Sequence, residues 1–247
     1  MNMKKVLVIN GSRNYVSKGY KIISKIQKGL DSNKFEMVLF DPNKLQLEFC
    51  RGCKNCFNTG KCPLDLKDSG KLLKDSMIEA DFIIFLSPVY AHNVSGDIKN
   101  IIDRLSYWLH LFPLLGKPGI IVTTTDTNGH KPVEEYLEHT VCLWGIDIIL
   151  KENFYNTYSQ QNIESRIEKI VNVINQMNFS KMPHFTSYQE AAFQNYKFAF
   201  SLNKETEEHR YWEENGLFCA DSMEELYKLR IMQKKAEAIF SNLHERV

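Results

Sequence analysis

The chain has 247 residues, 43% of them apolar, which is enough to bury the core of one domain of ordinary size with an appendage. Its 31 basic and 30 acidic residues leave a net charge of +1, so the charge balance favours neither nucleic acid nor an anionic membrane as a partner. The apolar run near the N-terminus is too short for a signal peptide, and a membrane helix needs about 20 apolar residues.

Short apolar runs alternate with segments of helical periodicity along the first two thirds of the chain. The apolar runs predict five strands, over residues 4–10, 36–41, 82–87, 119–124 and 147–151. The periodic segments predict helices over residues 20–30, 68–79, 96–109, 131–143 and 163–177. Because the strand runs are apolar throughout rather than alternating, both faces of the sheet should be covered, which predicts a doubly wound parallel α/β sheet.

The sequence changes in character near residue 179. Strand-like runs stop there, and a charged, aromatic-rich stretch follows. Residues 223–243 consist largely of good helix formers, with apolar residues spaced among charges. We therefore predict a domain over residues 1–178 and a helical C-terminal extension over residues 179–247.

The loop after the first predicted strand has the composition of a phosphate site. Ligands of such sheets bind outside the carboxyl ends of the strands, and the free N–H groups at a helix N-terminus favour an anion. This loop offers hydroxyls and cations at the start of the first helix, and its candidate binding residues are Ser12, Arg13, Asn14, Ser17, Lys18 and Gly19. A structural alternative stays open, in which Ser17 only caps the helix and Arg13 is solvated.

The loop after the third strand, with the helix that follows it, reads SPVYAHNVSGDIKNIIDR over residues 87–104. This segment resembles the ring-binding loop and following helix of the NAD(P)H-dependent FMN reductases and related flavodoxin-like oxidoreductases. A proline-stiffened loop can present backbone amides to the polar edge of a flavin while apolar side chains cover the ring. The candidate binding residues here are Pro88, Val89, Tyr90, His92 and Asn93.

The resemblance implies the rest of the expected architecture and chemistry. It implies a flavodoxin-like three-layer sandwich with strand order 2-1-3-4-5, bound FMN, NAD(P)H as a transient electron donor and a homodimer. The acceptor would be a small molecule such as a quinone, a nitro or azo compound, or a flavin. The flavin carries the chemistry, so no catalytic side chain is assigned.

The resemblance extends to two further loops. The first loop is similar to the family's phosphate loop Gly-Ser-x-x-x-x-Ser-x-Thr at Gly11, Ser12 and Ser17, with Gly19 in place of the threonine. We expect Lys18 to compensate electrostatically for the missing hydroxyl. The loop after the fourth strand stands where the family places a turn beside the flavin, which adds Thr125, Asp126 and Gly129 as candidates; an ordinary helix-capping loop is the alternative.

Four cysteines are clustered as Cys50-x2-Cys53-x2-Cys56-x5-Cys62. Such clustering is unlike a secreted disulfide scaffold and indicates a reducing compartment, so we expect a cytoplasmic protein. The spacing of the first three cysteines matches a bacterial ferredoxin run, whereas five residues rather than three precede the fourth. The motif resembles that of the iron–sulfur flavoproteins, in which the cysteines carry a [4Fe–4S] cluster. That resemblance implies an alternative function, a relay between ferredoxin, the cluster and FMN.

Other interpretations of the cysteine cluster stay open. They are reduced, unliganded thiols, a redox-labile disulfide, and a structural zinc site in a non-enzymatic module. The two isolated cysteines, Cys142 and Cys219, are expected to be buried hydrophobic residues rather than ligands.

Overall fold

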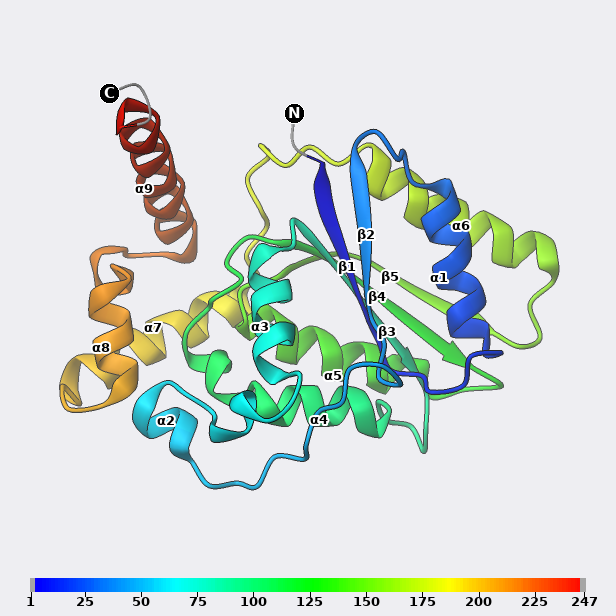
Figure 1. Cartoon of the computed structure of the whole chain (residues 1–247), viewed down its shortest axis with the longest axis horizontal. Coiled ribbons are helices and arrows are strands. Elements are labelled where there is room, and N and C mark those ends of the chain that lie inside the picture. Colours follow the sequence, from blue (N-terminus) through cyan, green and yellow to red (C-terminus); the bar gives the residue numbers. More distant parts are fainter. Residues whose placement is uncertain (1–2, 245–247) are drawn as a thin grey trace.

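A five-stranded parallel sheet forms the centre of the protein (Figure 1). The computed structural model describes residues 3–244, with side chains through residue 233. The strands are β1 (Lys4–Asn10), β2 (Phe35–Phe40), β3 (Phe82–Pro88), β4 (Pro118–Thr125) and β5 (Asp147–Tyr155). Their order is β2-β1-β3-β4-β5, and every neighbouring pair is parallel, which confirms the predicted topology.

Helices cover both faces of the sheet (Figure 1). One face is covered by α1 (Lys18–Gly29) and α6 (Gln160–Asn175), and the other by α3 (Gly70–Glu79), α4 (Gly96–Arg104) and α5 (His130–Leu143). In β1, Leu7 and Ile9 pack toward α3, α4 and α5, whereas Val6 and Val8 pack toward α1 and α6. This two-sided burial explains why the strand is apolar at consecutive positions.

The predicted helix over residues 96–109 consists of two pieces. The α-helix ends at Arg104, and a 3₁₀ helix, η2 (Ser106–His110), follows. Leu105 between them has φ −107° and ψ 14°, outside the α-helical region. Tyr107 and Trp108 in the second piece are buried in the core, so packing of these aromatic rings accompanies the break.

The C-terminal extension is helical, as predicted. It comprises α7 (Ser187–Leu202), α8 (Glu207–Glu214), the 3₁₀ helix η3 (Leu217–Cys219) and α9 (Met223–His244), which projects from the rest of the molecule (Figure 1). Phe193 and Trp212 belong to the same buried cluster as Leu7 and Ile9 of the sheet. The boundary between residues 178 and 179 stays a prediction, and residues 245–247 lie outside the described chain.

Between residues 3 and 244, none of the helices combines the length and the apolar character that crossing a membrane requires.

Candidate functional site

Three loops meet at the carboxyl edge of the sheet, after β1, β3 and β4. A Cβ atom on Gly11 would lie 2.5 Å from Ser95 Oγ, so the first loop touches the end of the second. A Cβ atom on Gly129 would lie 3.0 Å from Val89 Cγ1, so the third loop touches the second as well. The structure thus brings all the predicted flavin-binding segments together.

The first loop leaves the backbone N–H groups at the start of α1 without a side-chain cap. Ser17 occupies the N-cap position, but its side chain makes no capping hydrogen bond. Its Oγ lies 3.1 Å from Ser12 Oγ, and Ser12 Oγ in turn accepts a hydrogen bond of 3.3 Å from the Asn14 amide. Since Ser17 does not satisfy the first backbone N–H groups of α1, these groups are available to an anion.

The two cations of the first loop have partners within the protein. Arg13 forms an ion pair with Asp97 of α4, in which Nη2 lies 2.7 Å from Oδ1. Lys18 donates from Nζ to the backbone oxygen of Tyr155 at 2.5 Å. Burial lowers the pKa of Lys18, and nearby Asp126 partly offsets this effect. Through these contacts both cations tie the first loop to α4 and β5.

Gly19 has a steric reason to differ from the threonine of the family motif. It is buried, and a Cβ atom there would lie 2.9 Å from Leu86 Cδ2 of β3. Any larger residue would require Leu86 to move. The close approach of α1 to β3 therefore leaves no room for the threonine side chain that the motif places at this position.

The second loop is a tight hairpin turn. Tyr90 and Asn93 exchange two backbone hydrogen bonds, of 3.0 and 2.9 Å. The two central residues, Ala91 and His92, have φ of 49° and 61°, in the left-handed region that non-glycine residues rarely occupy. Paired left-handed residues form a type I′ turn, which is a strained geometry at this position without glycine.

Side chains of the second loop differ in exposure. Pro88 at the end of β3 is buried, Val89 is half-buried, and Tyr90, His92 and Asn93 are exposed. The backbone nitrogen of Val89 donates to the oxygen of Thr124 at 2.9 Å, which fixes the loop to β4. An apolar side chain and an aromatic ring thus border the open edge of the sheet.

The third loop is held by its own hydrogen bonds. Thr125 Oγ1 donates to the oxygen of Asn128 at 2.6 Å, and Asn156 Nδ2 donates to Asp126 Oδ1. Gly129 has φ 83° and occupies the N-cap position of α5, with no side chain to cap it. The glycine therefore permits both the turn and the close contact with Val89.

All four clustered cysteines line one cavity of about 210 Å³. They lie between β2 and α3, around the short helices α2 (Asn55–Thr59) and η1 (Pro63–Leu66). Cys50 and Cys53 are exposed, whereas Cys56 and Cys62 are half-buried. Burial raises the pKa of Cys56, and the neighbouring Cys62 adds to the effect.

Within the described residues, no three His, Cys, Asp or Glu side chains are gathered as ligands of a single metal ion. The four cysteines share the lining of the cavity without forming such a group.

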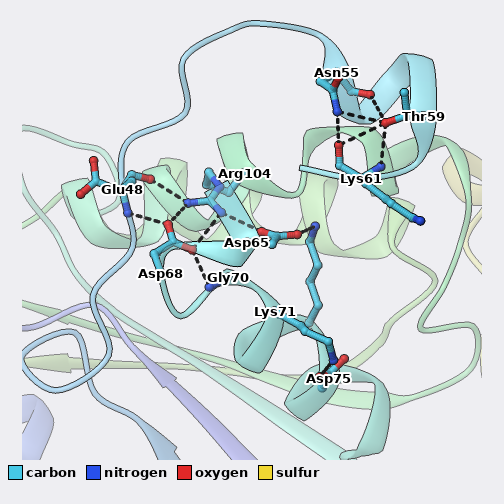
Figure 2. Close-up of polar contacts among 11 residues, drawn as sticks. Glu48, Asn55, Thr59, Lys61, Asp65, Asp68, Gly70, Lys71, Asp75 and Arg104 are labelled. Carbon is cyan, nitrogen blue, oxygen red and sulfur yellow. Dashed lines mark hydrogen bonds and ion pairs between the residues drawn. The ribbon is translucent and has the colours of Figure 1, made fainter. Parts of the chain in front are cut away.

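Residues at the end of α4 form hydrogen bonds to the chain on both sides of the cysteine loop (Figure 2). Arg104 donates from Nη1 to the oxygen of Glu48 at 3.0 Å and to Asp68, and from Nη2 to Asp65 at 2.7 Å. One turn earlier, Asn100 accepts a hydrogen bond of 3.2 Å from the Cys50 amide. Sequence reasoning did not assign these residues to the site. The available signals were the Asp-Arg end of the ring-loop segment and the acidic residues just after Cys62.

The two isolated cysteines differ from each other. Cys142 is buried, as expected, but Cys219 is exposed, so the prediction of burial was wrong for Cys219. Cys219 ends the short 3₁₀ helix η3, where neighbouring Leu217 and Ala220 take the buried positions.

A family model described as NADPH-dependent FMN reductase matches residues 4–157. The chain belongs to this family. The match spans the sheet and all three loops at its carboxyl edge, and at the level of the family it confirms the prediction of an FMN-dependent, NAD(P)H-linked flavin oxidoreductase.

Similar proteins include two described as iron–sulfur flavoproteins. One, from Archaeoglobus fulgidus, is 30% identical over 145 residues, which cover 58% of this chain and 64% of the relative. Another, from Clostridioides difficile, is 28% identical over 171 residues, or 67% of this chain and 75% of the relative.

A solved structure supports the fold. The flavoenzyme NAD(P)H:(acceptor) oxidoreductase of Paracoccus denitrificans aligns with a TM-score of 0.51 at 18% identity, over 70% of this chain and 96% of that one.

Proposed function

We propose that this chain is an NAD(P)H-dependent FMN oxidoreductase in which the four clustered cysteines hold a [4Fe–4S] cluster that exchanges electrons with the flavin. The observation that carries the proposal is the position of α4. Its N-cap Ser95 contacts the flavin loops, and Arg104 at its other end lines the cysteine cavity. Eight residue steps separate Gly96 from Arg104, a rise of about 12 Å. One rigid element therefore joins the two sites.

The residues at the sheet edge fit FMN. The open N–H groups of α1 with Ser12 and Ser17 would hold the phosphate, and Val89 with Tyr90 would border the ring. When bound, FMN would accept a hydride and release electrons singly or in pairs. Because the Tyr90–Asn93 turn is exposed, a nicotinamide could reach the ring from solvent.

The cysteine arrangement fits a cubane cluster better than zinc. Zinc requires four thiolates about 2.3 Å from one point. In a [4Fe–4S] cluster each thiolate ligates a different iron, so the four cysteines must border a space that holds the cluster, and the four cysteines here line one cavity. The relatives described as iron–sulfur flavoproteins support this assignment. Four free thiols also suit a reducing compartment such as the cytoplasm.

Two classes of acceptor are consistent with the proposal. Exposed basic residues border the cysteine cavity at Arg51, Lys54 and Lys67, which suits an acidic one-electron carrier such as ferredoxin. A small-molecule acceptor, such as a quinone, a nitro or azo compound, or free flavin, is the second candidate. It is favoured by Tyr90, which is 56% exposed beside the flavin position. A homodimer is part of the proposal by analogy with the family.

Metal and flavin analysis of protein purified without oxygen tests the cluster. We expect FMN together with about four irons and matching sulfide per chain. Cys53→Ser should lose the iron, whereas the control Cys219→Ser, outside the cavity, should keep it. Zinc in place of iron, or flavin alone, would contradict the cluster assignment.

Rapid mixing tests the electron donor. Anaerobic NADH or NADPH should bleach the flavin absorbance of the purified holoprotein. In wild type the cluster absorbance should then fall, whereas in Cys53→Ser only the flavin should respond. No bleaching with either nicotinamide would contradict the NAD(P)H-dependent activity.

A further inference from the structure

We propose that Arg104 donates a hydrogen bond from Nε to a sulfur atom at the cysteine cavity and thereby raises the reduction potential of the cluster held there. This inference rests on the proposed function, because it requires the cluster. It assigns to Arg104 a positioning and tuning role, distinct from the role of the four cysteine ligands.

The guanidinium of Arg104 has one unused donor. Nη1 and Nη2 are fully engaged with Glu48, Asp65 and Asp68. Nε is buried, and within the described part of the chain it has no hydrogen-bond partner. A buried donor without a partner is rare in folded proteins, so this N–H group indicates an acceptor that the protein chain itself does not supply.

The cavity is where that acceptor would lie. Arg104 lines the same cavity as the four cysteines, and its side chain is only 2% exposed. An arginine guanidinium stays protonated in folded proteins, even where it is buried. The guanidinium therefore stays charged and keeps its N–H donor.

The charges around Arg104 nearly cancel, so its effect on a cluster should come mainly from the Nε–H donor. Asp65 and Asp68 are balanced by Arg104 and Lys74, whose Nζ lies 2.6 Å from Asp65. The group is thus close to neutral as a whole. Its local effect on a sulfur atom comes from the directed N–H dipole, and Lys at position 104 could not reproduce that dipole because it has no Nε–H on a fixed plane.

The direction of the effect follows from charge. Adding one electron makes a cluster with four thiolate ligands more negative by one charge. A hydrogen bond to sulfur stabilises the more negative form more strongly, so it raises the reduction potential. Arg104→Lys should keep a cation beside Asp68 but lose this bond. We expect a reduction equilibrium about tenfold less favourable, or about 59 mV lower for a one-electron couple.

The test is a potentiometric titration of the anaerobic holoprotein, followed by electron paramagnetic resonance of the reduced cluster. The matched control is Arg51→Lys, because Arg51 lines the same cavity but is exposed. We expect a lower potential in Arg104→Lys and an unchanged one in Arg51→Lys. Equal potentials in wild type and Arg104→Lys would overturn the inference.

A second measurement does not depend on how the variant folds. In wild-type protein grown with ¹⁵N-arginine, the reduced cluster should show hyperfine coupling to an arginine nitrogen, and Arg51→Lys should retain it. Absence of coupling in cluster-loaded protein overturns the role of Arg104 alone. Absence of iron from wild-type protein contradicts the proposed function as well, so the two failures are distinguishable.

Discussion

Close backbone approach at Gly11 determines how the first and second loops meet. A Cβ atom there would lie 2.5 Å from Ser95 Oγ and 2.6 Å from Ile98 Cγ1. Gly11→Ala should therefore lower the free energy of unfolding by about 1–3 kcal/mol and weaken FMN binding. Gly96→Ala is the control, since a Cβ atom there meets nothing within 4 Å. Urea unfolding and flavin titration check this, and equal behaviour of the two variants would contradict it.

The two isolated cysteines should differ sharply in reactivity. Burial, with a contribution from Glu138, raises the pKa of Cys142 to about 12, so almost no reactive thiolate forms at pH 8. Cys219 is exposed. Iodoacetamide at pH 8 should modify Cys219 in the native protein and Cys142 only in urea, as measured by mass spectrometry. Because the thiolate fraction rises with pH, native Cys142 should stay unmodified until the pH approaches its raised pKa.

The start of α4 is a structural element shared by the fold and the proposed flavin site. Ser95 Oγ accepts a hydrogen bond of 3.4 Å from the Ile98 amide, and Ser159 Oγ caps α6 in the same way at 3.2 Å from Asn162. Each serine-to-alanine variant should cost about 1 kcal/mol of stability. Only Ser95→Ala should also weaken FMN binding, about fivefold for 1 kcal/mol. Similar flavin affinities in the two variants would show that the α4 cap does not support the loops.

The sequence was sufficient to predict most elements but not their mutual contacts. Strands β1, β3 and β4 were predicted to within one residue because both faces are buried along their central parts, where the residues are continuously apolar. In contrast, β5 continues four residues past Lys151 to Tyr155, through polar positions such as Glu152. Glu152 is buried there but forms ion pairs with Arg166 and Lys169, so a charged residue is tolerated in this strand and conceals its length.

For the candidate site, too, the sequence predicts the loops but not the contacts between distant residues. The loops after β1, β3 and β4 follow from motif and topology, because parallel strands place their carboxyl ends at one edge. The contact of Arg104 with Asp68 joins residues 36 positions apart, and the fold alone decides it. The Asp-Arg end of the ring-loop segment marks the arginine, but it does not indicate that the side chain is buried or which residues it contacts.

At the scale of the whole molecule, the extension and the sheet share one core. Trp212 of α8 is fully buried and stacks on Phe193 of α7 with 5.3 Å between ring centroids. Its Nε1 donates to the oxygen of His110 at 2.8 Å, directly beyond α4 in the chain. The extension is thus packed against η2, the segment that follows Arg104 of α4. Loss of this packing should affect both the proposed flavin site and the cysteine cavity.

Trp212→Ala tests whether residues 179–247 unfold with the sheet. Removing this side chain should cost about 3–5 kcal/mol, because the ring fills a core common to both parts. Phe198→Ala on α7 is the control; Phe198 is 69% exposed, so its loss should change stability by about 0.5 kcal/mol or less. We expect a single unfolding transition in urea, monitored both by near-ultraviolet circular dichroism and by flavin release. The midpoint of this transition should shift only in Trp212→Ala. An early separate transition that left the flavin bound would instead show that residues 1–178 fold on their own, because the sheet and its loops would then survive without the shared core.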